Sequence, residues 1–439
     1  MAVNESEARL VAYTRKTFLS MWSHSNIFYK KGKEFCDVMV IFGDDVVIMS
    51  DKLIKYREDV EENISWARWY ARAIEGSIKQ LYGAYKHIKA FPNQLYSNPQ
   101  ATVRFYAHLP SPDKIKIHLI AVANGCADAC GKKYNHLGLR FNNQCHGDEL
   151  PFTIGLPNKE FVHVFNEYNL DNIFSCLSTT RDFIDYLNAR KELLQTQNKT
   201  IEVYGEEELL ACWMLSQKGD DIFHMPYNRF EKMKDSYIIG PGHWNEYNRA
   251  ENKERREKFR RESFIIDDLI EHIYQEFNSN RLIIGQDKSL EYHEKAFRLL
   301  ASESRLGRQL ISGPLLEVMN EDPKTFWANI VESHDFEGRL YVWLIYPDVP
   351  PDVSDEKLLR IMLNQLKKYL LVAQCKFKDA YVIFGACLPN SKSTRTDRLF
   401  IVNDGTYWTE EMQSEAIRLE SEEGILKNIT STRFYSKRV

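Results

Sequence analysis

Apolar residues recur at helical spacing near the start of the chain and again after residue 59. Residues 5–21 carry apolar side chains three and four positions apart behind Asn4, a candidate N-cap, and this spacing predicts a first helix. Residues 59–88 contain no proline and repeat the spacing, which predicts a long helix that packs over a sheet. The segment 23–34 between them shows neither period, and we expect a loop there.

Strand patterns lie between and after these helices. The apolar runs 38–42 and 46–49 flank a turn at 43–45 and predict a β-hairpin. Both runs are apolar on both faces, which is typical of a sheet covered on each side. Residues 114–123 predict a further strand of that sheet. Beyond it we expect a short strand at 161–165 and a helix at 180–194.

The second half of the chain shows one clear unit. Residues 339–347 and 379–389 have strand patterns and flank a helical pattern at 354–373, which predicts a strand–helix–strand unit with parallel pairing. The mixed charges of residues 246–264 predict a solvent-exposed helix with ion pairs four residues apart, rather than a nucleic-acid surface. These elements together predict an α/β protein.

Length and charge limit the organisation. A chain of 439 residues exceeds what one hydrophobic core supports, and we place two domains at 1–200 and 201–439, divided at a polar stretch. The second could act as a sensor, in substrate binding or in oligomerisation. The net charge of -4 means that any nucleic-acid surface must be a local patch.

The chain start lacks the apolar core of a signal peptide, and no apolar run is long enough to span a bilayer. We therefore expect a cytoplasmic protein without a membrane partner. The eight scattered cysteines favour reduced thiols over a disulfide framework.

Candidate chemistry gathers on the predicted hairpin. Asp37 begins its first strand, where an oxygen ligand can project from the sheet end. On the second strand the period of two puts Ser50 and Lys52 on one face and Asp51 on the other. Oxygen ligands beside a lysine suit divalent-metal chemistry on a phosphodiester.

The pattern Asp37-x12-Ser50-Asp51-Lys52, after one helix and before a long one, resembles the PD-(D/E)xK, or restriction-endonuclease-like, nuclease superfamily. The resemblance covers about the first 125 residues and implies a mixed sheet flanked by helices. It implies that Asp37 helps to hold Mg²⁺ (or Mn²⁺) and that Lys52 assists attack on the phosphate.

The chain departs from that family at one position, because Ser50 stands where the second metal-binding acid is expected. A hydroxyl is a weaker ligand than a carboxylate, and Asp51 could replace it only if a bulge after Met49 turned it inward. Many members also carry a glutamate on the first helix. Glu7 matches that role best, and Glu5 and Glu34 match it less well.

The long helix offers polar groups for binding the substrate. Arg68, Arg72, Lys79 and Gln80 are predicted to contact nucleic acid, DNA in the first instance, largely through its backbone. The tryptophans on that helix, Trp66 and Trp69, are expected in the core instead.

A second set of residues contains enough ligands for zinc. Cys126-x3-Cys130 could combine with Cys145 and His146, but the three-residue gap departs from the usual knuckle and favours buried thiols.

The function expected from these patterns is metal-dependent hydrolysis of DNA or RNA, and analogy with the superfamily suggests an effector of prokaryotic defence. The alternatives are an inactive nuclease fold that binds nucleic acid or serves as a scaffold, a purely structural Asp37–Lys52 pair, and a main activity in the C-terminal strand–helix–strand unit. A homo-oligomer stays open.

Overall fold

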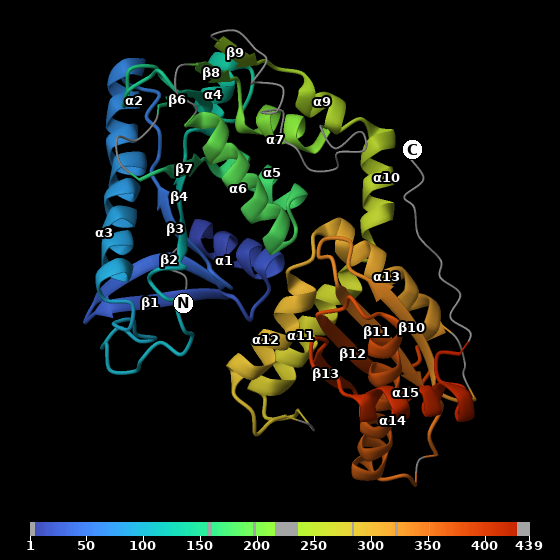
Figure 1. The fold of residues 1–439 in the computed structure, drawn as a ribbon. Coiled ribbons are helices and arrows are strands. Elements are labelled where there is room, and N and C mark those ends of the chain that lie inside the picture. Colours follow the sequence, from blue (N-terminus) through green and yellow to red (C-terminus); the bar gives the residue numbers. More distant parts are fainter. Residues whose placement is uncertain are drawn as a thin grey trace. The chain divides into compact units, whose positions relative to one another are not determined.

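The computed structural model describes residues 5–155, 160–195, 199–215, 236–282, 285–320, 324–350 and 352–427. The chain forms two compact units, Met1–Arg255 and Arg256–Val439, each built from helices around mixed sheets (Figure 1). It is an α/β protein, as predicted. The division lies inside α10 (Ala250–Arg260) and not near residue 200, where the polar stretch suggested it.

The elements of the N-terminal unit are, in chain order, α1 (Glu5–Phe18), β1 (Ser23–Lys30), β2 (Lys33–Phe42), β3 (Asp45–Leu53), α2 (Glu62–Tyr70), the π-helical turn η1 (Ala71–Glu75), α3 (Gly76–Ala90), β4 (Lys116–Asn124), α4 (Ala127–Tyr134), β5 (Arg140–Asn142), β6 (Thr153–Ile154), β7 (Val162–Phe165), α5 (Glu167–Cys176), α6 (Thr180–Leu194), β8 (Thr200–Val203), α7 (Glu206–Leu215), β9 (Ser236–Ile239), α9 (His243–Tyr247) and α10.

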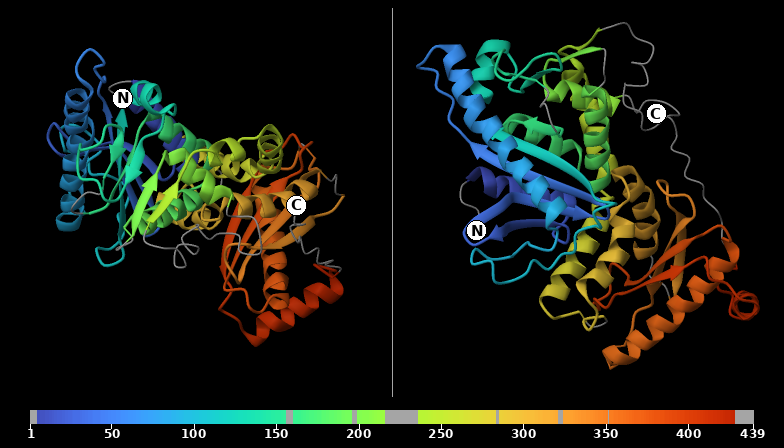
Figure 2. Two further views of the ribbon diagram at one scale, coloured as in Figure 1. Left: turned by 90° about the horizontal axis from the view of Figure 1, so that it is seen from above. Right: turned by 60° about the vertical axis from the view of Figure 1, so that its left-hand side comes forward.

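The central sheet of this unit has the order β1-β2-β3-β4-β7. The pairs β1–β2 and β2–β3 are antiparallel, whereas β3–β4 and β4–β7 are parallel. Residues 46–49 of β3 are fully buried, which confirms the prediction of a sheet covered on both faces. The long helix lies across one face, as the right-hand view of Figure 2 shows, and α1 and α5 pack on the other.

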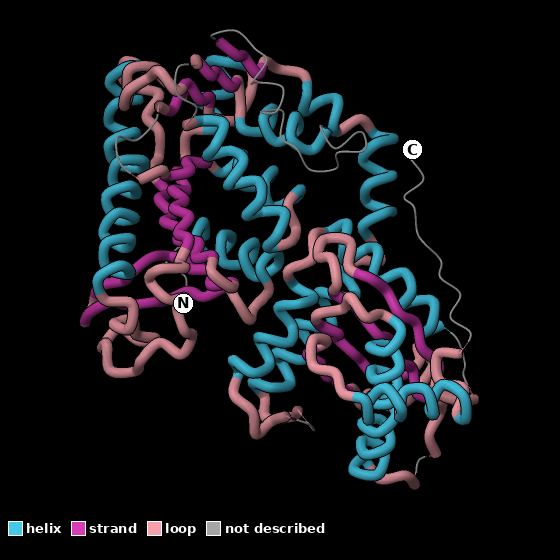
Figure 3. Tube along the Cα trace, in the orientation of Figure 1, coloured by secondary structure: helices cyan, strands magenta, loops and turns pink. Residues whose placement is uncertain are grey.

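The expected loop at 23–34 is wrong, because most of it forms β1. This strand pairs with β2 from Ser23 opposite Val40 to Lys30 opposite Lys33. The segment carries few apolar residues because β1 is an edge strand, partly covered by the loop 91–110, which Figure 3 shows beside the outer strands. An edge strand needs less apolar surface than a central one, so its pattern is weak.

The predicted helices of the N-terminal unit are confirmed with small differences. The first helix ends at Phe18, not at residue 21, because Leu19 adopts a left-handed backbone conformation with φ 63°. The candidate N-cap Asn4 lies outside the described residues. The long helix contains the π turn η1, and its Trp66 and Trp69 are 0% and 2% exposed, so they are core residues as predicted.

A second sheet explains why the unit extends beyond residue 200. Its order is β6-β5-β8-β9, so β8 completes a sheet begun by β5 and β6. Glu206 at the start of α7 accepts two hydrogen bonds from Arg190 on α6, at 2.8 and 2.9 Å. Both side chains are buried, so this ion pair joins α7 to the predicted helix α6.

The elements of the C-terminal unit are α11 (Phe264–Asn278), α12 (Leu290–Ala301), α13 (Arg305–Asn320), β10 (Trp327–Glu332), β11 (Arg339–Tyr346), α14 (Asp355–Lys376), β12 (Val382–Pro389), β13 (Leu399–Asp404) and α15 (Glu410–Glu422). Its sheet has the order β10-β11-β12-β13, and β11 and β12 pair in parallel through α14, as predicted. Every residue of β11 is buried, with alternate side chains packed against α14 on one face and α13 on the other.

Two further observations concern helices. α10 has no buried side chain, which confirms the prediction of a solvated helix in the charged segment. Within the described ranges, no helix has the length and apolar character needed to cross a membrane.

Candidate functional site

The β2–β3 ladder opens at Asp37. Residue pairs run from Phe42 opposite Asp45 to Val38 opposite Met49, and Asp37 follows directly beyond the last of them. Its carboxylate there accepts a hydrogen bond of 2.6 Å from the backbone N–H of Asp51. The strand β3 continues to pair with β4 as far as Leu53. The aspartate side chain thus takes over the role of a backbone acceptor at the point where β2 leaves β3.

The next two side chains of β3 point to opposite faces of the sheet. Ser50 is fully buried and donates a hydrogen bond of 3.2 Å to Gln80 Oε1 on α3. Asp51 faces the other way and accepts hydrogen bonds from Ser6 Oγ on α1 at 2.5 Å and Asn124 Nδ2 at the end of β4 at 2.7 Å. The predicted alternation of this strand is therefore present.

The bulge that would have turned Asp51 into the second acid position is absent. Register with β4 is unbroken from Asp45 opposite Lys116 to Leu53 opposite Asn124. Both carboxylate oxygens of Asp51 already accept a hydrogen bond. Asp51 therefore joins α1, β3 and β4, and the predicted metal-binding role receives no support from its contacts.

Charged side chains interact around Asp37, and we call Glu7, Glu34, Asp37, Asp51 and Lys52 the Asp37 site. Burial raises the pKa of Asp37 to about 6; its bond to the Asp51 backbone and nearby Lys52 oppose this, while the charges of Asp51 and Glu7 add to it. Burial likewise raises the pKa of Glu34 to about 7, with further increases from Asp37 and Glu7 and a decrease from Lys52. The lysine therefore stands close enough to both carboxyl groups to favour their charged forms.

The charge balance of this site is unfavourable for the protein alone. Glu7 is only 4% exposed and its charge raises the pKa of Glu34, Asp37 and Asp51. Burial also raises the pKa of Asp51, although its hydrogen bonds from Ser6 and Asn124 oppose the change. Lys52 and, for Asp51, Arg9 act against these increases, but the carboxyl groups still raise one another's pKa where solvent is scarce.

The donor set suits a divalent cation in chemical type. Mg²⁺ takes oxygen ligands and is often held by one or two carboxylates while it keeps several waters. Asp37 and Glu34, with Glu7 beside them, offer such oxygens, and a cation would relieve their mutual repulsion. In the part of the chain that the structure describes, no three His, Cys, Asp or Glu side chains are gathered as a complete metal site. Water and substrate oxygens must therefore complete any coordination.

The predicted substrate-binding residues of the long helix divide into two groups. Arg68, Arg72 and Lys79 are exposed. Gln80 instead contacts Ser50 beneath the helix, so it belongs to the surroundings of the Asp37 site.

The zinc ligands considered from the sequence do not assemble. Cys126, Cys130 and Cys145 are buried free thiols, whereas His146 is exposed. Cys130 Sγ donates to the carbonyl of Gly138 at 3.2 Å. Among the described residues no metal-binding group of three includes them.

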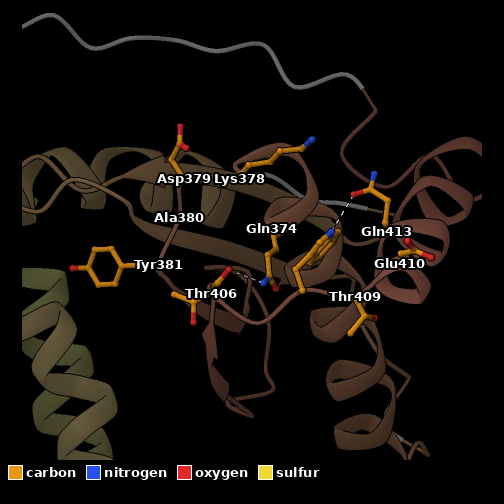
Figure 4. A pocket seen from close by; sticks show the side chains of 11 residues that line it. Gln374, Lys378, Asp379, Ala380, Tyr381, Thr406, Thr409, Glu410 and Gln413 are labelled. Atoms are coloured by element: carbon orange, nitrogen blue, oxygen red, sulfur yellow. Dashed lines mark hydrogen bonds between the residues drawn. The ribbon is translucent and has the colours of Figure 1, made fainter.

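The C-terminal unit has a cavity of about 600 Å³ at the end of α14 (Figure 4), lined by Gln374, Lys378, Asp379, Ala380, Tyr381, Gly405, Thr406, Trp408, Thr409, Glu410 and Gln413. Gln374 uses its amide group to donate to the carbonyls of Gly405 and Tyr407, at 3.0 and 2.8 Å. Trp408 Nε1 donates to Gln413 at 3.1 Å. These hydrogen bonds hold the lining of the cavity together.

Three residues gain importance from the structure. The sequence favoured Glu7 over Glu34, but the pKa of Glu34 responds to three members of the site, Asp37, Glu7 and Lys52. Ser6 and Asn124 were not predicted. Asn124 could have been found from its place at the end of β4, because the ends of adjacent parallel strands meet at one edge.

Comparison with known proteins found no match: no family model fits the chain, and neither a curated protein nor a solved structure is similar to it.

Proposed function

We propose that the N-terminal unit is a metal-dependent nuclease that hydrolyses phosphodiester bonds at the Asp37 site. The observation that carries the proposal is the opening of the β2–β3 ladder, where half-buried Asp37 and Glu34 lie within the electrostatic influence of Lys52. Carboxyl groups whose pKa is strongly shifted by burial and by a specific charge partner mark candidate functional sites. The resemblance of the Asp37-to-Lys52 pattern to the PD-(D/E)xK superfamily supports the same reaction.

The residues divide between metal binding and charge stabilisation. Asp37 and Glu34, with Glu7, would hold Mg²⁺ or Mn²⁺, which when bound makes water a better nucleophile and polarises the phosphate. The ammonium of Lys52 would stabilise the negative charge that grows on the phosphate oxygens. Ser50 and Gln80 would keep the strand fixed against α3. DNA is the expected substrate, and a part in prokaryotic defence rests on the resemblance alone.

One observation favours a second candidate, a nuclease-like fold that binds nucleic acid without cutting it. Ser50 pairs with Gln80, and Asp51 pairs with Ser6 and Asn124. Neither residue supplies the second acid that the family pattern places on this strand.

Cleavage by site variants decides between the two. Purified protein should nick plasmid DNA with Mg²⁺ or Mn²⁺ and stop when EDTA is added. Asp37→Asn and Lys52→Ala should each lower the single-turnover rate by at least about 100-fold, since each removes a group that acts on the transition state. Lys52→Ala should still bind Mn²⁺ in calorimetry, whereas Asp37→Asn should not.

Matched controls separate chemistry from general loss of charge. Lys55→Ala removes an exposed lysine three residues beyond Lys52, and Asp59→Asn neutralises an exposed aspartate. Both should cut like the parent. Equal cleavage by all four folded variants, or cleavage that persists in EDTA, would remove the Asp37 site from the reaction.

A further inference from the structure

Two stretches of the chain contain no aspartate or glutamate, residues 8–33 and 76–112. Together they hold ten lysine and arginine residues, although the whole chain carries a net charge of -4. Because they lack acids, the two segments together carry a net charge of +10, and they are separated by more than forty residues. Whether these charges produce a positive electrostatic potential on the surface depends on where the fold places the two segments.

The fold brings the two segments together at the turn between β1 and β2. Phe28 of β1 pairs with Tyr96 of the loop after α3, and the backbone N–H of Gly32 in the turn donates to Pro99 at 2.8 Å. The rings of Tyr29 and His87, from β1 and α3, lie 5.2 Å apart. In Figure 1 the same turn lies beside the lower end of α3.

Six exposed cations belong to this region, and we call them the tip surface: Lys30, Lys31, Lys33, Lys86, Lys89 and Arg104. Over the described part of the chain, none of the six has a carboxylate partner in an ion pair. Most surface lysines of a mildly acidic protein have acidic neighbours that cancel their field. Here neither segment contains an acid of its own, and acids recorded nearby, Glu34 after Lys33 and Glu160, whose charge raises the pKa of Tyr85 on α3, come from outside the two segments.

Aromatic rings are interleaved with these cations. Lys30 Nζ lies 5.4 Å from the ring centre of Tyr29, and the Arg104 guanidinium lies 4.9 Å from that of Tyr96. Phe91, directly after α3, is 51% exposed. Cations that follow a backbone and open rings that stack on bases are the two components of single-strand binding surfaces.

The tip surface also leads towards the Asp37 site. Lys33 begins β2, and Asp37 lies four residues further along it, about 13 Å at the rise of a strand. Glu34, whose pKa responds to Asp37 and Lys52, directly follows Lys33. A bound strand could therefore extend from the turn to the carboxyl groups over a few nucleotides.

We propose that the tip surface binds single-stranded nucleic acid, with its cations on the phosphates and its open rings, Phe91 above all, against unpaired bases. The choice of a polynucleotide over other polyanions rests on the proposed function. Duplex nucleic acid contacts the same cations but keeps its bases away from the rings, so it binds more weakly. The surface differs from Arg68 and Arg72 on α2 and η1, which the sequence singled out.

Binding is measured by fluorescence anisotropy with a labelled 20-nucleotide DNA strand, the equivalent RNA and the DNA duplex, all in EDTA so that nothing is cut. The test variant carries Lys30→Gln, Lys31→Gln and Lys33→Gln. Its matched control carries Lys295→Gln, Lys357→Gln and Lys367→Gln, three exposed lysines of the C-terminal unit that remove the same charge.

The test variant should bind the single strand at least about tenfold more weakly than the parent. The slope of its log K against log salt concentration should be shallower by about 2, since each of the three lost phosphate contacts on a single strand contributes about 0.7. The control should stay within about twofold of the parent. Phe91→Ala should weaken single-strand binding by about tenfold and leave duplex binding unchanged, because stacking contributes about 1–3 kcal/mol per base.

Three results would overturn the proposal: equal binding by the test and control variants, tighter binding of the duplex than of the single strand, or lysine-dependent binding to phosphatidylserine vesicles without binding to any polynucleotide. The outcome is separate from that of the proposed function. A protein that binds through the tip surface but cuts nothing keeps this inference and loses the nuclease. A protein that cuts equally well with the three lysines replaced keeps the nuclease and loses this inference.

Discussion

Each unit holds a carboxyl group whose pKa burial raises to about 7, Glu34 in the N-terminal unit and Glu303 in the C-terminal unit. Glu303 is fully buried, and its Oε1 accepts hydrogen bonds from Ser333 at 2.6 Å and Tyr341 at 2.7 Å, with Arg339 at 3.3 Å. Glu34 is only partly buried; the charges of Asp37 and Glu7 raise its pKa further, and Lys52 lowers it.

The difference shows what a raised pKa can and cannot indicate. In both units it records the cost of burying a charge. Around Glu303 the donors come from the β10–β11 connection and β11, so the carboxyl joins the α12–α13 corner to the sheet and no substrate can reach it. Around Asp37 the carboxyl groups are partly accessible, and Lys52 offsets their mutual repulsion only in part. The proposed function therefore rests on the Asp37 site and not on Glu303.

The largest effect expected from this comparison is on stability in the C-terminal unit. Glu303→Ala should lower the free energy of unfolding by about 3 kcal/mol, because it removes the carboxylate that Ser333, Arg339 and Tyr341 share and leaves the Arg339 charge buried without this counter-charge. Urea unfolding of the full chain measures the loss, and Glu332→Ala, at an exposed strand end, is the control. If Glu303→Ala lowers the free energy of unfolding no more than this control does, the hydrogen bonds of Glu303 do not stabilise the unit and the contrast with Glu34 fails.

A smaller effect of opposite sign is expected at Asp37. Because the folded protein raises its pKa from 3.8 to about 6, the folded state binds the proton more tightly than the unfolded state does. Stability from this group is therefore greatest below pH 4, falls as the pH rises to about 6, and is constant above it. Asp37→Asn, which can still accept from the Asp51 N–H, removes the penalty.

That variant should be about 1–2 kcal/mol more stable than the parent at pH 8, after allowance for solvent screening, and no more stable at pH 4. Thermal melts in EDTA at both pH values measure this, with exposed Asp59→Asn as the reference. Adding Mn²⁺ at pH 8 should reverse the order, since it stabilises only the parent. A variant less stable than the parent at pH 8 in EDTA would show that the Asp37 charge is already compensated.

The sequence predicts much of the fold because its buried elements have strong periods. The helix 180–194 and the parallel strands β11 and β12 lie within three residues of their predicted positions. For the two strands the reason is that packing on both faces demands continuous apolar residues. Edge strand β1 was missed because one side of it faces a loop and needs little apolar surface. The boundary near 200 was misplaced because β8 pairs with β5, about sixty residues earlier, and no local pattern records that pairing.

In the candidate site, too, the sequence predicts what depends on neighbouring residues and misses what depends on distant ones. Strand parity predicted the opposite directions of Ser50 and Asp51, because it depends only on neighbouring residues. The partners of these residues could not be predicted, since Ser6, Gln80 and Asn124 come from three different elements. Glu34 was undervalued because it lay in a segment that was expected to be a loop.

The smallest effect concerns Ser50, the position at which the chain departs from the family pattern. Its hydroxyl is fully buried beside Gln80, so a carboxylate there would lie inside the sheet–helix interface near the Asp37 site. Ser50→Asp should bind Mn²⁺ about three- to tenfold more tightly than the parent, at most about 1.4 kcal/mol, since the added oxygen ligand is partly offset by its own desolvation. Ser50→Asn is the matched control, because it has the same size without the charge, and calorimetric titration of the two variants at pH 8 gives the comparison. Equal Mn²⁺ affinities would place Ser50 outside the surroundings of the ion, and the accessible carboxylates Asp37 and Glu34 would then have to hold it without help from β3.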